Sequence, residues 1–396
     1  MMSDGVSQAL ERYATPFFLF DEGELQAQAA RIRSWMPANV QLCYAMKANS
    51  FVLEQMSREV ERIEVCSEGE ARSCFALGVP DEQLVISGVH KESSFIDEFV
   101  REHPHMCRYT VESKAHFDML AKAAQSAGHP IRVLMRLTSG NQFGMTAAEV
   151  KELAQRCAKL PLVEFVGIQH YSGTQKTSLK RVARELRKID SLIAELEAAG
   201  VPVSELEYGP GFPVSYYDLP EEDQAQLEGL ACGLADQLGQ MTFDGTVVLE
   251  IGRALVASCG TYATRVVDLK SNKTGNYAIV DGGKHQFVYY GNAMSMRQPP
   301  CQVLPSKQQG SVRAWNFCGS LCTVTDILVK QLEVQDLTVG DALVFERAGA
   351  YCMTEGISLF LSRDLPSVVM RDVHGSLRLA RERIETYVYN TPGVHV

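Results

Sequence analysis

Short apolar runs alternate with amphipathic stretches over residues 42–250. Stretches such as 147–157 and 179–198 carry apolar residues at three- and four-residue spacing, which predicts helices. The runs between such stretches predict eight strands: 42–46, 63–66, 84–87, 107–111, 132–137, 163–169, 205–208 and 247–250. Eight strand–helix repeats predict a (β/α)8 TIM-like barrel, because each parallel strand needs a crossover. A doubly wound sheet is the alternative, but no GxGxxG motif follows the first run.

The pattern changes after about residue 254. Short β-branched or alternating runs follow one another, separated by turns such as 271–276 and 339–341. They predict strands at 260–269, 277–280, 312–317, 342–345, 368–371 and 376–379. We therefore expect an α/β chain with a barrel at 31–253 and an all-β domain at 254–396. Residues 1–30 contain the strand-like segment 16–21 and are expected to pack with the β domain.

The composition of the chain restricts the class of protein to which it can belong. A chain of 396 residues with 46% hydrophobic content can bury a full core, and its length predicts two domains. The net charge of -10 argues against nucleic acid as the main partner, because phosphate binding needs a basic surface. The first twenty residues do not resemble a signal peptide, and no 18-residue apolar run predicts a membrane span. Eleven scattered cysteines without a CxxC pair predict reduced thiols, no metal site and a cytoplasmic protein.

Several chemically capable residues fall at the carboxyl ends of the predicted barrel strands, where active sites of such barrels lie. Lys47 follows the first strand, His170 the sixth, Gly211 the seventh and Glu250 the eighth. Each has an ordinary alternative: a lysine running out into solvent, a core histidine, a plain glycine loop or a satisfied carboxylate. Together they supply an amine for an aldehyde, a glycine loop for a phosphate and a carboxylate for a pyridine nitrogen. This combination predicts a pyridoxal 5'-phosphate site.

Nine motifs in order resemble the alanine-racemase-fold decarboxylases, the family of ornithine, diaminopimelate and biosynthetic arginine decarboxylases. They lie at residues 15–21, 44–49, 64–70, 142–144, 170–174, 209–212, 250–253, 318–322 and 349–351. Each is weak alone, but their shared order spans nearly the whole chain. The resemblance implies a homodimer in which the cysteine loop reaches the partner's site.

The resemblance also implies roles for individual residues. Lys47 would be the Schiff-base lysine, and His170 would stack on the cofactor ring. Cys322 matches the catalytic cysteine, which would return a proton to the α-carbon after carbon dioxide leaves. Its ordinary alternative is an inert thiol. The residues implied to bind the cofactor are Lys47, His170, Ser172, Gly211, Glu250, Gly252, Arg253 and Tyr351.

Departures from the family pattern concern the substrate. Thr323 stands where members acting on basic amino acids carry an acid that pairs the distal amine, whereas Asp326 is retained. The arginine that holds the distal carboxylate in diaminopimelate decarboxylases is absent, and Arg297 is a nearby substitute or a surface arginine. Gln142 replaces the usual lysine before Phe-Gly in a shortened loop.

These features are most similar to the branch that serves siderophore and antibiotic assembly. They predict an α-decarboxylase for an amino acid or a conjugated amino acid, including one bound to a carrier protein. The alternatives are a diaminopimelate, lysine or ornithine decarboxylase of primary metabolism and an amino-acid racemase. A non-catalytic inhibitor homologue is a further alternative, but such proteins tend to lose the lysine or the cysteine.

Overall fold

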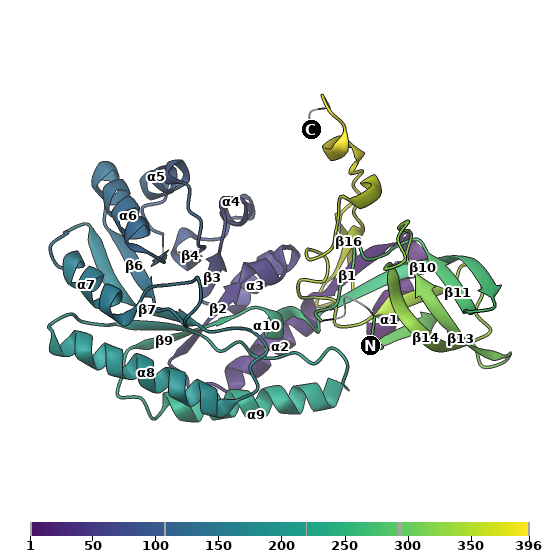
Figure 1. The fold of residues 1–396 in the computed structure, drawn as a ribbon, viewed down its shortest axis with the longest axis horizontal. Coiled ribbons are helices and arrows are strands. Elements are labelled where there is room, and N and C mark those ends of the chain that lie inside the picture. Colours follow the sequence, from purple (N-terminus) through teal and green to yellow (C-terminus); the bar gives the residue numbers. More distant parts are fainter. Residues whose placement is uncertain (1, 107, 219, 292–294, 395–396) are drawn as a thin grey trace. The chain divides into compact units, whose positions relative to one another are not determined.

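The computed structural model describes residues 2–106, 108–218, 220–291 and 295–394 (Figure 1). They divide into two compact units, each described by itself here. The barrel unit comprises Ala29–Val214 and Pro220–Leu255. The β unit comprises Met1–Gln28, Ser215–Leu219 and Val256–Val396.

The barrel unit contains a closed ring of eight parallel strands. They are β2 (Val40–Ala45), β3 (Arg62–Val65), β4 (Leu84–Ile86), β5 (Arg108–Val111), β6 (Ile131–Arg136), β7 (Val163–Tyr171), β8 (Glu205–Gly209) and β9 (Thr246–Ile251). Neighbours along the chain pair in order, and β9 returns to pair with β2 from Val40↔Val247 to Tyr44↔Ile251. The predicted barrel is therefore confirmed. Of the predicted fourth strand, which corresponds to β5, Cys107 lies outside the described residues.

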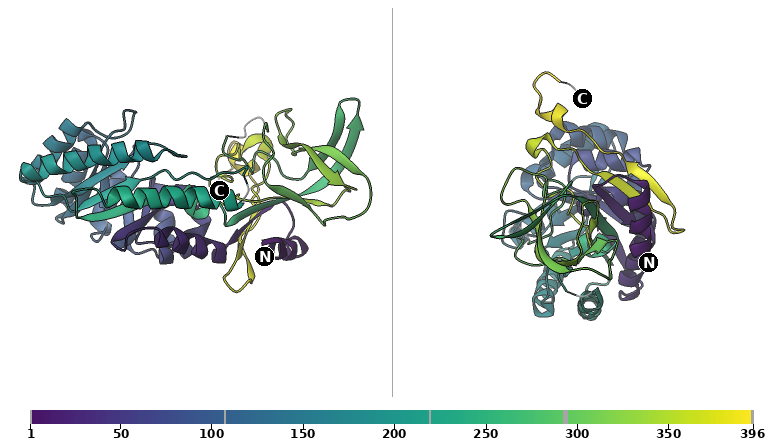
Figure 2. Two further views of the ribbon diagram at one scale, coloured as in Figure 1. Left: turned by 90° about the horizontal axis from the view of Figure 1, so that it is seen from below. Right: turned by 90° about the vertical axis from the view of Figure 1, so that its right-hand side faces the viewer.

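Helices cover the outside of the barrel strands (Figures 1 and 2). They are α2 (Glu22–Ser34), α3 (Leu53–Glu59), α4 (Glu68–Ala76), α5 (Ser93–Glu102), α6 (Lys114–Ala127), α7 (Ala147–Cys157), α8 (Leu179–Ala198), α9 (Pro220–Leu238) and α10 (Arg253–Val256). Local sequence sets where they begin. For example, Thr146 and Glu149 form a capping box at α7, and the Ser178 hydroxyl accepts from the N–H of Arg181 at α8. Short 3-10 helices η1 (Met46–Ala48), η2 (Ser50–Val52) and η3 (Asp81–Gln83) complete the unit.

A buried ion cluster ties three barrel strands together. Glu205 of β8 forms bidentate contacts with Arg62 of β3 and also accepts from Arg108 of β5, whose Nη2 lies 2.6 Å from its Oε2. The side chains of Arg62 and Glu205 are 8% and 3% exposed. Burial alone would raise the pKa of Glu205, but the two guanidinium groups lower it. One carboxylate therefore compensates two buried cations.

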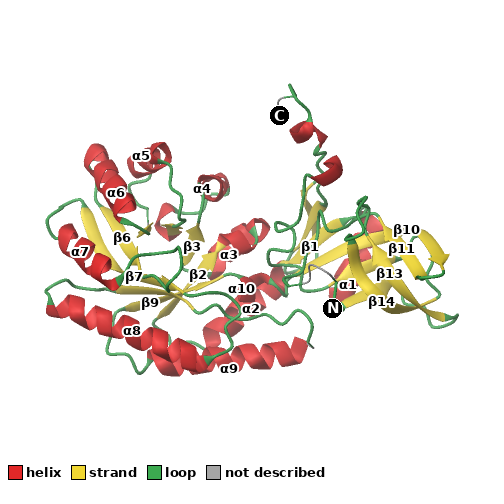
Figure 3. Cartoon of the chain, viewed as in Figure 1, coloured by secondary structure: helices red, strands yellow, loops and turns green. Residues whose placement is uncertain are grey.

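The β unit is a nine-stranded, mostly antiparallel sheet (yellow in Figure 3). Its strands are β1 (Phe17–Asp21), β10 (Gly260–Asn272), β11 (Gly275–Val280), β12 (Cys301–Leu304), β13 (Val312–Cys318), β14 (Ile327–Gln335), β15 (Ala342–Phe345), β16 (Ser367–Arg371) and β17 (Leu377–Arg381). The N-terminal strand β1 lies inside the sheet, antiparallel to β10 and parallel to β16. Helix α1 (Met2–Arg12) and the 3-10 helices η4 (Phe360–Ser362) and η5 (Tyr387–Asn390) also belong to this unit.

Three elements of the β unit were not predicted. Strand β14 contains Gln331 at φ 53, and its pairing with β13 shifts register, so the alternation of buried and exposed residues is interrupted. Strand β12 is only four residues long and half-buried throughout. Helix α1 places Val6 and Ala9 in the core with Leu10 packed against them, an apolar period that the sequence analysis overlooked. Among the described residues, no helix is both long and apolar enough to cross a membrane.

Removing the shared carboxylate should destabilise the barrel. Glu205→Leu would remove the carboxylate that Arg62 and Arg108 share inside the barrel, and we expect the free energy of unfolding to fall by about 3–5 kcal/mol. Urea denaturation of the cofactor-free protein measures this change. Glu164, exposed on β7, offers the matched control. Glu164→Leu should change the stability by less than about 0.5 kcal/mol, and equal losses in both variants would contradict the prediction.

Candidate active site

Lys47 stands at the carboxyl rim of the barrel. Strand β2 is largely buried and ends at Ala45, where the chain turns into η1, so Lys47 lies two residues after the end of the strand. Its Nζ forms ion pairs with Glu64 of β3 and, at 3.2 Å, with Oε1 of Glu250 of β9. The Sγ of Cys66 lies 3.8 Å from the same nitrogen. A lysine from one strand thus meets carboxylates from the strands on both sides.

The two carboxyl groups beside Lys47 hold one proton between them. Burial raises the pKa of Glu250 to about 7, with a further contribution from the Glu64 carboxylate that outweighs the attraction of Lys47. Burial acts on Glu64 in the same direction, but the Lys47 ammonium and the Glu250 hydrogen bond lower its pKa to about 2. Glu64 is therefore the charged partner of Lys47, whereas Glu250 gains and loses its proton near neutral pH.

His170 is fixed as a neutral ring near the end of β7. Its Nδ1 lies 3.0 Å from the carbonyl oxygen of Leu137, an acceptor, so that nitrogen carries the hydrogen. Burial lowers the pKa of the imidazole. The ring is stacked with that of Tyr208 at a centroid distance of 6.3 Å and an interplanar angle of 10°. Both constraints hold the orientation of the imidazole.

The loops after β7 and β8 approach each other closely. Gly211 has φ +61, and a Cβ at this position would lie 2.1 Å from the carbonyl oxygen of Gly173. The N–H of Lys176 donates to the carbonyl of Gly211 at 2.9 Å. Only glycine allows the two backbones to approach this closely, and we call this contact the glycine crossing. At this crossing the predicted phosphate loop packs against the loop that follows β7. Gly252 and the buried Arg253 follow the end of β9 at the same rim.

Ser172 belongs to a buried polar cluster that sequence reasoning missed. Its hydroxyl donates to Glu185 at 2.6 Å and accepts from the Lys176 ammonium at 3.0 Å. Lys176 is 2% exposed and also pairs with Glu185 at 3.0 Å, while the Tyr208 hydroxyl donates to the same carboxylate. Burial acts to raise the pKa of Glu185, but these contacts lower it to about 2. The cluster fixes the Ser172 hydroxyl beside the glycine crossing.

A cavity of about 320 Å³ opens at the rim. Its lining includes Lys47, Glu64, Cys66, Arg136, Tyr171 and Glu250. The donor set of this lining fits pyridoxal phosphate: a primary amine suits the aldehyde, and a carboxyl with a raised pKa suits the pyridine nitrogen. Contact of the glycine crossing with the phosphate stays a prediction.

A family model described as pyridoxal-dependent decarboxylase, pyridoxal binding domain, matches residues 22–257. This match covers more than half of the chain. The chain belongs to the pyridoxal-dependent decarboxylase family. It is accordingly a pyridoxal phosphate-dependent carboxy-lyase that acts on an amino acid, with the alanine-racemase fold.

Individual relatives cover almost the whole chain. Diaminopimelate decarboxylase of Pseudomonas aeruginosa is 28% identical over 374 residues, which are 89% of this chain and 87% of the relative. The L-glutamyl-[BtrI acyl-carrier protein] decarboxylase of Niallia circulans is 24% identical over 403 residues, covering 96% and 93%. The crystal structure of diaminopimelate decarboxylase from Helicobacter pylori complexed with L-lysine superposes with a TM-score of 0.83 at 23% identity, covering 96% and 97%. The structural likeness supports the fold of this family member.

In this family member, the remaining predicted residues lie in the β unit. Cys322 and Thr323 are on the exposed loop between β13 and β14, and Asp326 closes that loop. The Asp326 carboxylate accepts the backbone N–H of Lys284 and of Leu321, both at 2.8 Å. Asp326 therefore orders the loop that carries Cys322, and its predicted contact with substrate stays a prediction.

The segment 282–288 adjoins both this loop and Tyr351. The N–H of Ser320 donates to the carbonyl of Gly282 at 2.8 Å, and the N–H of Val288 donates to the carbonyl of Cys352 at 2.9 Å. Tyr351 adopts φ +63, an uncommon conformation for a tyrosine. Elsewhere in the unit, the guanidinium of Arg297 lies 4.0 Å from the ring centroid of Tyr217.

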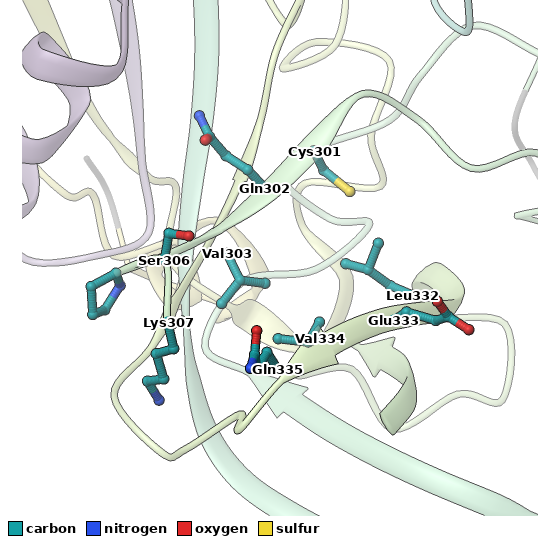
Figure 4. A pocket seen from close by; sticks show the side chains of 10 residues that line it. Cys301, Gln302, Val303, Ser306, Lys307, Leu332, Glu333, Val334 and Gln335 are labelled. Atoms are coloured by element: carbon teal, nitrogen blue, oxygen red, sulfur yellow. The ribbon is translucent and has the colours of Figure 1, made fainter. Parts of the chain in front are cut away.

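The β unit contains a second cavity of about 260 Å³, between the edge strands β12 and β14 (Figure 4). Lys307, the cation in its lining, donates to Asp336, Thr338 and Asp341, each at 2.8 Å. This ammonium is occupied in closing a turn, so the cavity shows no chemistry comparable to that of the barrel rim.

Sequence reasoning also missed acidic residues inside the barrel. Glu64 was part of a quoted motif but had no assigned role; a carboxylate within a four-residue buried strand was the available signal. Glu207 of β8 is fully buried, and its Oε1 accepts from Gln169 at 2.6 Å. Burial and the charges of Glu250 and Glu64 raise the pKa of Glu207 to about 8.

This raised pKa predicts a pH dependence of stability. Glu207 favours its neutral form more strongly in the folded state, so its contribution to stability is present at low pH and is lost as the pH rises through about 8. In Glu207→Gln this group no longer titrates. We therefore expect the stability of the variant relative to wild type to increase between pH 6 and pH 9, measured by denaturant unfolding at each pH. Glu164→Gln is the control, and parallel curves for Glu207→Gln and wild type would refute the assignment.

Proposed function

We propose that this chain removes the α-carboxylate of an amino acid whose distal end is already conjugated, in the assembly of a siderophore or an antibiotic. The observation that carries the proposal is the loop containing Cys322. Thr323 replaces the acidic clamp, and its hydroxyl lies 3.1 Å from that of Thr325. Asp326 is the acidic residue of the described loop 319–326. Each of its two carboxylate oxygens accepts a hydrogen bond from a backbone N–H. A free distal ammonium would therefore find no carboxylate offered by this loop.

The relatives support both this substrate class and its alternative. The Niallia relative is named for a glutamyl group on an acyl-carrier protein, which supports a conjugated substrate. The Pseudomonas relative is named for diaminopimelate, which keeps a free diamino acid as the second candidate. The absence of the distal-carboxylate arginine argues against that candidate.

The residues at the barrel rim have different roles toward the cofactor. When bound, pyridoxal phosphate draws off the electron pair left on the α-carbon as carbon dioxide departs. Lys47 provides the amine that holds the aldehyde, and Glu64 is the counter-ion of its ammonium. Glu250 keeps a proton available for the ring nitrogen, and neutral His170 offers a flat face. Other proposed cofactor contacts are Ser172, Gly211, Gly252, Arg253 and Tyr351.

Cys322 is the proposed acid that returns a proton to the α-carbon. Its exposure on the loop between β13 and β14 suits a group that enters the site of a second subunit in a homodimer. Exposed apolar side chains of the same unit suit a buried contact of this kind. They include Ile357, Leu359, Phe360 and Leu361.

Three variants separate anchoring from proton donation. Lys47→Ala should lose the yellow imine absorbance of the holoenzyme together with carbon dioxide release. Cys322→Ala should keep the absorbance but release carbon dioxide about 10²–10⁴-fold more slowly. Cys232→Ala, at an exposed cysteine on α9, is the matched control and should change neither. A Lys47→Ala protein with intact imine absorbance would rule out this lysine as the anchor.

Carbon dioxide release from a substrate panel tests the substrate class. The holoenzyme should act on carrier-bound glutamate or a citryl-diamino acid with kcat/KM at least about 10²-fold above that for free lysine, ornithine or diaminopimelate. Thr323→Asp should raise the value for free ornithine or lysine, because it restores an acid for the distal ammonium. Efficient turnover of free diaminopimelate by the wild type would sink the proposal in favour of primary metabolism. Loss of optical rotation without carbon dioxide release would indicate a racemase.

A further inference from the structure

The exposed side of α8 carries a row of cations. Lys180, Arg184, Arg187 and Lys188, here called the basic stripe, are all exposed. Their spacing of four, seven and eight residues places them on one side of the helix, about 12 Å long. The residues Val182, Leu186 and Ile189 are buried on the opposite side. The basic stripe is therefore an outward surface of the barrel unit.

Three of the four lysines and arginines on α6 and α7 form an ion pair, unlike those of the basic stripe. On α6 and α7, Lys114, Lys151 and Arg156 each pair with a carboxylate at 2.7–2.8 Å. Within the part of the chain that the structure describes, the four cations of the basic stripe form no ion pair with a carboxylate. A chain of net charge -10 thus concentrates four uncompensated positive charges on two turns of one helix.

The basic stripe starts at the positive end of the α8 dipole. Lys180 lies in the first turn, where the helix dipole disfavours a cation. Helix α9 follows the usual preference, with Glu221, Glu222 and Asp223 in its first turn, whereas α8 has no acid there. The arrangement costs helix stability and at the same time favours a bound anionic partner.

The basic stripe begins beside the candidate active site. Strand β7 ends at Tyr171, which lines the cavity with Lys47, and α8 starts eight residues later at Leu179. The intervening loop carries Ser172. Connections of this kind leave the barrel at its carboxyl rim, so the N-terminal half of α8 starts at the rim where the cavity opens.

We propose that the basic stripe docks an acidic carrier protein that presents the amino acid as a thioester on a flexible arm. This inference rests on the proposed function and deepens it. A tethered substrate enters a rim cavity only if its carrier docks nearby, and docking raises the local concentration of the substrate. Opposite charge on the two surfaces speeds their encounter and aligns the arm with the rim.

Charge reversal tests the basic stripe without touching the rim residues. Arg184→Glu/Arg187→Glu is compared with Lys122→Glu/Lys159→Glu, which makes the same charge change at exposed lysines on α6 and just after α7. The probes are L-glutamyl acyl-carrier protein and L-glutamyl pantetheine thioester, with carbon dioxide release as the readout. The Arg184/Arg187 variant should raise KM for the carrier substrate about tenfold, with kcat little changed and the pantetheine substrate unaffected. The control should match the wild type, and added salt should raise the wild-type KM.

The outcomes separate the basic stripe from the proposed function. An unchanged carrier KM in the Arg184/Arg187 variant would overturn docking at the basic stripe and leave the function standing. Release from a citryl-diamino acid but from neither thioester would do the same. No release from any conjugate, with release from free diaminopimelate, would overturn both. Stripe-dependent sedimentation with phosphatidylserine vesicles, with carrier KM unchanged, would assign the surface to a membrane instead.

Discussion

The closure of the barrel between its first and last strands is the constraint on which the site depends. Pairing of β2 with β9 brings Lys47 and Glu250, which are 203 residues apart in sequence, within 3.2 Å. The neighbouring β2–β3 pairing adds Glu64 from the other side. The Lys47 ammonium stabilises the charge of the buried Glu64 carboxylate. The proposed cofactor anchor is thus held in place by an ion pair with a neighbouring strand.

The barrel was readable from sequence because its signals are local and repeated. Each strand is a short apolar run, and each crossover helix shows a clear period. In the β unit, prediction failed where the period was broken, as at the bulge around Gln331 in β14, or where an element was too short, as in β12. The central position of β1 was also beyond local pattern, because its partners come from distant parts of the chain.

Some residues of the candidate site could be predicted from sequence and others could not. Lys47, His170, Gly211 and Glu250 were found because they end strands whose carboxyl ends share one rim. The polar cluster around Ser172, which also contains Lys176, Glu185 and Tyr208, was not found. A lysine on a loop and a glutamate on an amphipathic helix have the sequence pattern of surface residues, and only tertiary packing buries the lysine. Glu207 was hidden for a related reason: strand alternation does not reveal whether an inward carboxyl is ionised.

The place of β1 in the β unit has a consequence for biosynthesis. Phe20 pairs with Gly260, 240 residues later, and Phe17 pairs with Ser367, 350 residues later. During translation this apolar segment emerges before the whole barrel. Its sheet can be completed only after β16 and β17 have left the ribosome. Until then Phe17–Asp21 is an unpaired hydrophobic segment. Early collapse of the chain or chaperones must protect it from aggregation.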